Sequence, residues 1–332
     1  MKSALRPFLL NIFILAVAAF LSVAVGSVRL GWDEILAVAG GSAAEPARTI
    51  LLTLRLPRAL LMMLCGAALA GSGAAYQGLF RNPLADPYLI GAASGAGLGA
   101  AAAFSLGMPG GNLSYLTVPL FAFAGALLTV AVVYRLASST GGTPSSILIL
   151  AGVAVSSFVT ALTSFLLINA SGDLRRAVVW LVGGSTMAGW KPFWAALPYA
   201  VIGLIGLLRL AYPLNVLQLG DEQAAQLGLH VENTRRWTVI AATLATAAAV
   251  AFSGVIGFVG LLVPHIIRRL WGGDHRRLLP LSMLAGAAFL LLADVIARAL
   301  LAPQELPVGV VTALCGAPFF LFILRRTRQG LE

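Results

Sequence analysis

Apolar stretches of about twenty residues recur from one end of this 332-residue chain to the other, with little sequence left between them. A helix needs roughly 20 apolar residues to cross the hydrocarbon core of a bilayer. Only 10% of the residues are charged and 59% are hydrophobic, whereas a soluble domain carries about a quarter charged residues. The sequence therefore predicts an all-α polytopic membrane protein, with residues 1–332 forming a single transmembrane domain.

Ten transmembrane helices can be placed in these stretches. The predicted spans cover residues 8–28, 58–79, 88–106, 115–136, 145–168, 192–211, 237–253, 255–270, 278–301 and 307–324. The first span follows Lys2 and Arg6 as a signal peptide would, but it is too long and lacks a clear small-residue cleavage site. We therefore interpret it as a permanent span.

The charge distribution decides whether the long apolar run from Trp237 to Ile267 is one span or two. If it is split near Gly254, and the N-terminus is cytoplasmic, 14 of the 22 Lys and Arg residues lie on the cytoplasmic side. A single span would leave 8 of the 22 there, against the positive-inside rule. Two spans are favoured, with both termini cytoplasmic. Topology also explains the net charge of +10. We therefore expect the chain to be surrounded by membrane lipid and to have no nucleic-acid partner.

The sequence lacks the motifs of an ATPase or a metalloenzyme. A P-loop needs a lysine after a glycine, and the only lysines, Lys2 and Lys191, do not follow one. The three histidines lack the spacing and companion ligands of a metal site. We expect no metal, no catalytic residue and no cofactor on this chain, and a membrane-embedded enzyme is disfavoured because no nucleophile and base can be paired.

One acidic residue, Asp294, lies well inside a predicted span, and Arg298 follows it one helical turn later. The two side chains can pair on one helix face. Ion-coupled transporters use acids inside the membrane as proton or cation sites. An ion-coupled secondary transporter is therefore the weaker alternative to a transporter that is driven by ATP hydrolysis on a partner protein.

The largest predicted cytoplasmic loop, residues 213–232, contains a candidate amphipathic helix from Pro213 to Gly228. Asp221 and Glu222 would complement the helix dipole near its start, and Gly228 would end it. Such a helix suits contact with a motor protein, although an ordinary interfacial helix fits the spacing equally well.

The chain resembles the iron-chelate, haem and vitamin B12 permeases of type II ABC importers, the FecCD-like family, over nearly its whole length. The segments that carry the resemblance are Arg55-Leu56-Pro57-Arg58, Gly66-Ala67-Ala68-Leu69-Ala70 leading to Gln77, Arg81-Asn82-Pro83-Leu84-Ala85-Asp86-Pro87, Leu219-Gly220-Asp221-Glu222, the stretch 257–265, the stretch 293–298 and the stretch 305–309. Together these segments are highly specific.

The resemblance implies a homodimer of ten-span subunits in the cytoplasmic membrane of a bacterium or archaeon, with the transport path on the two-fold axis. Two ATPase subunits would bind ATP and Mg below, and an extracytoplasmic substrate-binding protein would dock above. It also implies three groups of site residues: ATPase coupling by Gly220, Asp221, Glu222, Ala224, Ala225, Leu227 and Gly228, a cytoplasmic gate at Asn82, Leu84, Ser145 and Ser146, and binding-protein docking by Arg55 and Arg298 with Arg58 in support.

Each implied role has a simpler alternative in the residues themselves. Asn82 and Pro83 interrupt the chain where two spans meet the cytoplasm, which suits a moving constriction or a plain turn. The three arginines at external span ends suit docking to acidic residues or interfacial snorkelling.

The weakly polar candidate lining suits a bulky chelate, and we expect an iron complex such as a siderophore or haem, with cobalamin as the alternative cargo.

Overall fold

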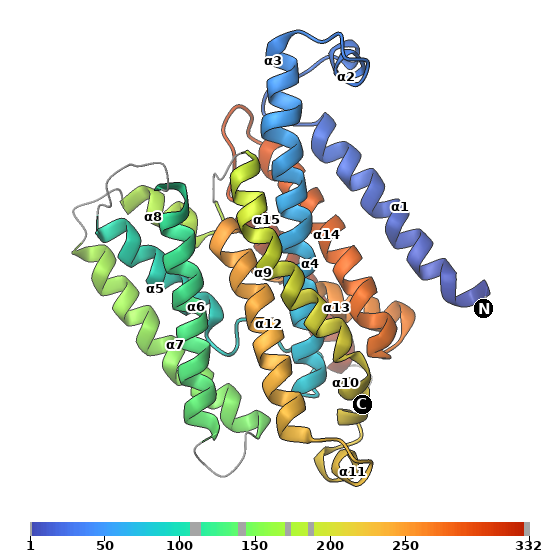
Figure 1. Ribbon diagram of the computed structural model, residues 1–332, viewed down its shortest axis with the longest axis vertical. Coiled ribbons are helices and arrows are strands. Elements are labelled where there is room, and N and C mark those ends of the chain that lie inside the picture. Colours follow the sequence, from blue (N-terminus) through green and yellow to red (C-terminus); the bar gives the residue numbers. More distant parts are fainter. Residues whose placement is uncertain (1, 107–113, 139–143, 170–173, 185–188, 329–332) are drawn as a thin grey trace.

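The computed structural model of this chain is built of helices throughout its described residues, which are 2–106, 114–138, 144–169, 174–184 and 189–328 (Figure 1). In chain order the helices are α1 (Lys2–Ala24), α2 (Trp32–Ala39), α3 (Glu45–Arg48), the π-helix η1 (Thr49–Arg55), α4 (Leu56–Leu79), α5 (Ala92–Ser105), α6 (Ser114–Ser138), α7 (Ser145–Ile168), α8 (Leu174–Leu181), α9 (Trp190–Arg209), α10 (Ala211–Leu217), α11 (Asp221–Gln226), α12 (Val231–Ser253), α13 (Val259–Trp271), α14 (His275–Ala299) and α15 (Val308–Arg328).

Each of the ten predicted apolar stretches contains a helix. Among the described residues, 7 helices are long and apolar enough to cross a membrane. The other three stretches correspond to α5 with 14 residues, α13 with 13 residues, and the apolar part of α15, Val308–Leu321. At 1.5 Å per residue, α5 and α13 span only about 20 Å, so each depends on the adjoining non-helical backbone to cover the rest of a membrane's thickness.

The long run from Trp237 to Ile267 is divided into two helices, as the charge distribution predicted. Helix α12 ends at Ser253, and α13 begins at Val259. Gly254 between them has a φ of +76°, and Phe258, which precedes α13, has a φ of +69°. Positive φ is a conformation that glycine adopts readily and that phenylalanine rarely does. Non-helical backbone at this depth is tolerated because Gly254 and Ile256 are buried in protein.

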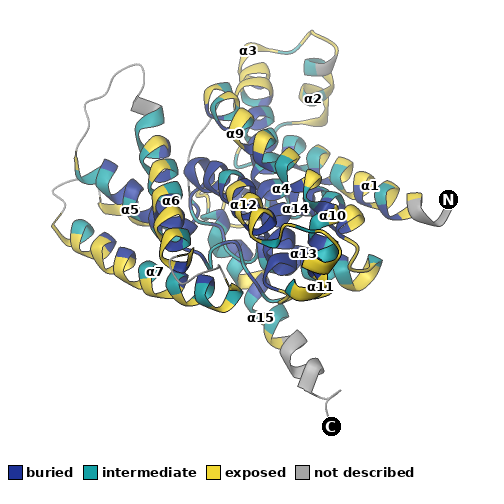
Figure 2. Cartoon of the chain, turned by 60° about the horizontal axis from the view of Figure 1, so that its bottom comes forward, coloured by how far each residue is buried: buried dark blue, intermediate teal, exposed yellow. Residues whose placement is uncertain are grey.

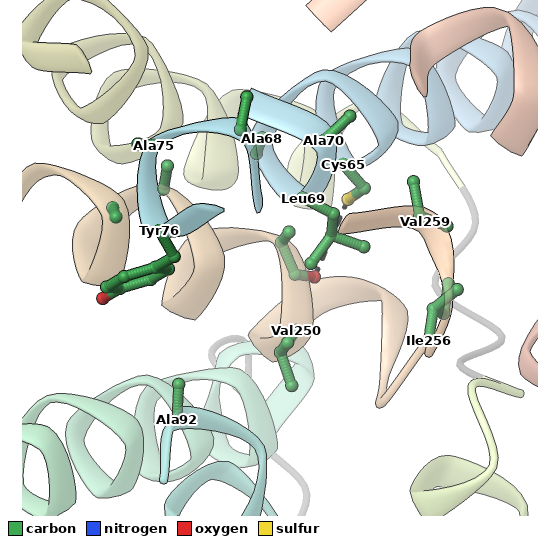
Figure 3. Packing of buried hydrophobic residues seen from close by; sticks show 14 of the residues in the cluster. Cys65, Ala68, Leu69, Ala70, Ala75, Tyr76, Ala92, Val250, Ile256 and Val259 are labelled. Carbon is green, nitrogen blue, oxygen red and sulfur yellow. Dashed lines mark hydrogen bonds between the residues drawn. The ribbon is translucent and has the colours of Figure 1, made fainter. Parts of the chain in front are cut away.

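Helix α4 lies at the centre of the fold, packed against α9, α12, α13 and α14 (Figure 2). The backbones of α4 and α14 touch where Gly66 faces Gly286, and those of α4 and α13 touch where Gly73 faces Gly260, since a Cβ at either α4 glycine would overlap the opposite carbonyl. Small residues permit this close approach, which replaces the hydrophobic effect as the source of packing energy in lipid. In Figure 3 Cys65 and Leu69 of α4 lie against α12, where the Cys65 thiol contacts the Ala249 carbonyl at 3.7 Å, whereas Val250 of α12 points to the other side, toward Ala92.

The structure differs from the sequence-based expectation in two regions. The helical rod that contains the span 58–79 begins at Glu45 and runs through η1 into α4. Pro57 has no N–H to donate to the preceding turn, and the Leu52 carbonyl in that turn accepts from the Trp190 indole at 3.1 Å. The segment predicted as one cytoplasmic helix, Pro213 to Gly228, forms two helices, α10 and α11. Helix α10 ends at Leu217, and Gly220, with a φ of +106°, precedes α11.

Candidate functional site

The predicted coupling residues of the loop 213–232 lie on α11 or directly beside it, at the end of the molecule opposite α3 (Figure 1). Helix α11 ends in a paired turn: Gly228 N donates to Ala225 O at 2.9 Å, and Leu229 N donates to Ala224 O at 3.0 Å. Gly228 has a φ of +83°, which this helix-ending motif requires. Ala224 is fully buried, whereas Ala225 and Leu227 face outward, Leu227 with 66% of its surface exposed. Glu222 is also exposed.

The predicted gate residues lie close together at the same end of the molecule. Asn82 N donates to Gln77 O at 3.1 Å at the end of α4, and the Asn82 Oδ1 atom accepts from Leu84 N at 2.9 Å. The first residue of α7, Ser145, points its Oγ at Leu79 O, 3.4 Å away. Ser146 is exposed and Leu84 is half-buried. The loop after α4 and the start of α7 are thus neighbours, although 60 residues separate them in sequence.

An ion-pair network joins the loop 80–91, the predicted gate loop, to α11, the predicted coupling helix, and sequence reasoning missed it. Asp221, the first residue of α11, contacts Arg81 of the gate loop at 3.3 Å and Arg235 of α12 at 2.5 Å. Arg235 is only 5% exposed and also pairs with Glu232 at 3.1 Å. Gln218 adds a second link, since its Nε2 donates to Gly78 O in the last turn of α4 at 2.8 Å. The available signal was the arginine that begins the Arg81-Asn82-Pro83 motif.

The arginines predicted to dock a binding protein are buried in this structure. Arg55 is 6% exposed and donates to the carbonyls of Val23 and Ala24, at 2.9 and 2.8 Å, and to that of Val28. These carbonyls belong to the end of α1 and the turn after it, where a helix leaves its last carbonyls unpaired.

Arg298 acts on the same helix end from α14. It is 3% exposed, donates to Ser22 O at 3.0 Å and Val25 O at 3.1 Å, and pairs with Asp294 at 2.9 Å. The expected pairing of Asp294 with Arg298 is therefore present. Both arginines cap α1, a role that fits neither snorkelling nor an exposed docking surface in this conformation.

Arg58 is the most accessible of the three arginines. Its side chain is 22% exposed and bridges Asp294 at 2.9 Å and Glu305 at 2.7 Å. Asp294 is thus held between two guanidinium groups, and a fully buried carboxylate needs such compensation. An acid that is paired in this way is poorly suited to bind a transported proton or cation, which disfavours the ion-coupled alternative.

Among the described residues, no group of three His, Cys, Asp or Glu side chains could hold a metal ion. The described part of the chain combines membrane-length helices with an exposed short helix, α11, at one end.

Comparison with known proteins places this transport protein in a family. The model of the FecCD transport family matches residues 14–326, and the chain belongs to that family. It is a permease of the type II ABC importers, and the relatives of this chain are transport subunits.

Its relatives span bacteria and archaea. The cobalamin import system permease protein BtuC of Halobacterium salinarum is 48% identical over 85% of this chain and 74% of its own length. The Fe(3+) dicitrate transport system permease protein FecD of Escherichia coli is 39% identical over 99% of this chain and 100% of its own. A solved inward-facing ABC transporter, assigned to the metal-chelate type, has a TM-score of 0.83 at 31% identity, covering 97% of this chain and 99% of that one.

Proposed function

We propose that two copies of this chain form a path that moves a bulky metal chelate inward across the cytoplasmic membrane by alternating access. Two ATPase subunits would bind ATP and Mg²⁺ at the α11 end, and an extracytoplasmic binding protein would deliver the cargo at the α3 end. Both termini would then lie in the cytoplasm. The chain itself would bind no nucleotide.

The observation that carries this proposal is the contact between Asp221 and Arg81. Asp221 is the first residue of α11, the exposed helix that an ATPase would bind. Arg81 lies in the loop after α4, which would close the path. A displacement of α11 would therefore pull on the loop that contains Asn82 and Leu84. Ion pairs at exposed positions contribute little stability, so this link can break and reform as the path opens and closes.

A substitution on the outer surface of α11 tests the coupling role. Ala225→Arg places a charge on the face that would enter the ATPase, while the buried Ala224 keeps α11 in place. We expect lost ATPase assembly or lost stimulation of hydrolysis, with the protein still folded. The matched control is Ala44→Arg, the same change at an exposed alanine beside α3 at the other end of the molecule. Equal assembly and hydrolysis in both variants would contradict the coupling role.

Two cargoes are supported by different observations. An iron complex is the cargo expected from the family resemblance, and FecD, named for ferric dicitrate, matches over the full chain. Cobalamin is favoured by the 48% identity to BtuC. Uptake of labelled ferric siderophore, haem and cobalamin into proteoliposomes that contain the whole complex separates them. Uptake of none of the three would contradict the chelate proposal.

Docking through Arg55 and Arg298 would require the end of α1 to move away, because both guanidinium groups are occupied there. Replacing each with lysine keeps its charge but removes the planar two-pronged donor. If these arginines dock the binding protein, Arg55→Lys with Arg298→Lys weakens its affinity, and the wild-type affinity falls as salt rises. Titration of the immobilised complex at two salt concentrations measures both effects. Equal affinities of the wild type and the double variant at each salt concentration would show that the two arginines only cap α1.

A further inference from the structure

A groove of about 440 Å³ lies between α6 and α12 and is lined by none of the predicted gate, coupling or docking residues. Its walls are almost wholly apolar, with Leu127, Val130 and Ala131 on α6 and Val239, Ile240 and Leu244 on α12. Thr243 also lines it, but its hydroxyl group already contacts the Tyr76 hydroxyl at 3.2 Å. The groove therefore offers its occupant an apolar surface with no unmet hydrogen bond along its length.

The length of the groove fits one leaflet of a bilayer. From Arg236 to Leu244 the lining residues of α12 extend over nine residues, whose eight helical steps cover about 12 Å. One leaflet contributes about 15 Å of hydrocarbon. The groove is apolar along its length and about as long as the hydrocarbon of one leaflet, which suits an acyl chain.

A positive charge lies at one end of this groove. Arg236 lines it near the start of α12, is exposed, and has no ion-pair partner among the residues that the structure describes. Tyr134 of α6 lines the same end. Next to Arg236, Trp237 is 59% exposed, and aromatic residues with basic neighbours are typical of the headgroup level of a membrane. The apolar groove therefore runs from the headgroup level into the hydrocarbon.

We propose that this groove binds one acyl chain of an anionic phospholipid, with the headgroup phosphate against Arg236. Arginine makes strong charge-assisted hydrogen bonds to phosphate, and the apolar walls of α6 and α12 enclose the chain. The site would hold the two helices together from the leaflet at the α11 end. Its lining contains none of the predicted gate residues, so lipid binding should need neither cargo nor ATPase.

Native mass spectrometry of the purified protein, titrated with phosphatidylglycerol or phosphatidylcholine, tests the proposal. We expect Arg236→Gln to weaken phosphatidylglycerol binding about tenfold, since a hydrogen bond to a charged group is worth about 1.5 kcal/mol or more. The matched control is Arg209→Gln. Arg209 is exposed, is the last residue of α9 and does not line the groove. This control should bind phosphatidylglycerol as the wild type does.

A second variant tests the groove itself. Ala131 is exposed and lines the groove, so Ala131→Trp fills the groove without disturbing the core. This variant should lose the bound lipid of either headgroup. Equal effects of Arg236→Gln and Arg209→Gln, or full lipid binding by Ala131→Trp, would overturn the proposal. Loss of a protein dimer in Ala131→Trp, with lipid binding retained, would assign the groove to a second copy and would also overturn it.

Discussion

At the scale of single residues, the buried arginines near the end of α1 stabilise the fold by capping that helix. Arg55 and Arg298 come from different helices and meet at the carbonyl end of α1. The sequence places both arginines at span ends, but it contains no pattern that predicts their acceptors. The acceptors at this helix end are backbone carbonyls of Ser22 and of apolar residues near it, more than 25 positions away from either arginine.

We predict that Arg298→Met destabilises the protein by about 3 kcal/mol or more, because a buried charge that loses a partner is costly. Asp294 would keep only Arg58, and the end of α1 would lose one of its two caps. Adding Asp294→Asn should recover part of the loss. Thermal unfolding in detergent of the two single variants and the double variant measures the coupling. Strictly additive effects would show that the pair contributes nothing beyond its separate members.

Asp274 supports a prediction about pH. Desolvation is the largest single influence on Asp274 and opposes its ionisation. Hydrogen bonds from Arg276 N and the Asn215 side chain, with the charges of Arg276 and Arg277, together outweigh it and lower the pKa of Asp274. A group with a lowered pKa stabilises the fold above its unfolded pKa and loses that contribution as pH falls through its folded pKa.

We therefore predict that Asp274→Ala costs about 1 kcal/mol at neutral pH, because it removes the cap of α14. The cost should shrink as the pH falls below about 4. Asp274→Asn is the control, since asparagine also caps helices but does not titrate in this range. Melting temperatures of the three proteins across this pH range provide the measurement. A cost for Asp274→Ala that stays constant down to pH 3 would contradict it.

At the scale of helices, hydrophobic length and glycine placement predicted most of the elements. All ten apolar stretches contain helices, and the break after α12 follows Gly254 as expected. The boundaries were less predictable, because tertiary contacts decide where a helix begins. Helices α2 and α8, of 8 residues each, were missed, since segments this short resemble loops in sequence and owe their helical form to their surroundings.

The close contact of α4 with α14 gives a prediction at this scale. Gly66→Ala should destabilise the protein by about 1–3 kcal/mol, because its Cβ would overlap the Gly286 carbonyl and force the two helices apart. Gly257→Ala is the matched control, since a Cβ there meets nothing within 4 Å and Gly257 has no positive φ. Equal thermal stability of the two variants would show that α4 and α14 can separate without cost.

At the scale of the whole molecule, the gate loop and the coupling helix meet through residues 140 positions apart in the chain. A single sequence contains no sign of such a pair, because nothing in the local pattern around Arg81 distinguishes Asp221 from the other acidic residues. The residues of both regions could be identified from the family resemblance. Their connection required the fold, in which α4 ends beside α10 and α11.

The gate loop supports the last prediction. Asn82 Oδ1 holds Leu84 N at 2.9 Å, which fixes the turn that follows α4, and Ser145 of α7 lies against the same helix end. If this turn closes the path, Asn82→Ala with Leu84→Ala should let cargo leak across a reconstituted membrane without ATP, because a constriction has lost both its bulk and its hydrogen bond. Substitution of Arg81 by Gln should instead leave the membrane tight and lower the transport obtained per ATP, because it removes the link to Asp221 and leaves the turn intact. Release of labelled cargo from sealed proteoliposomes, with and without ATP, distinguishes these outcomes. A double variant that stays tight and transports normally would assign Asn82 and Leu84 to a plain turn.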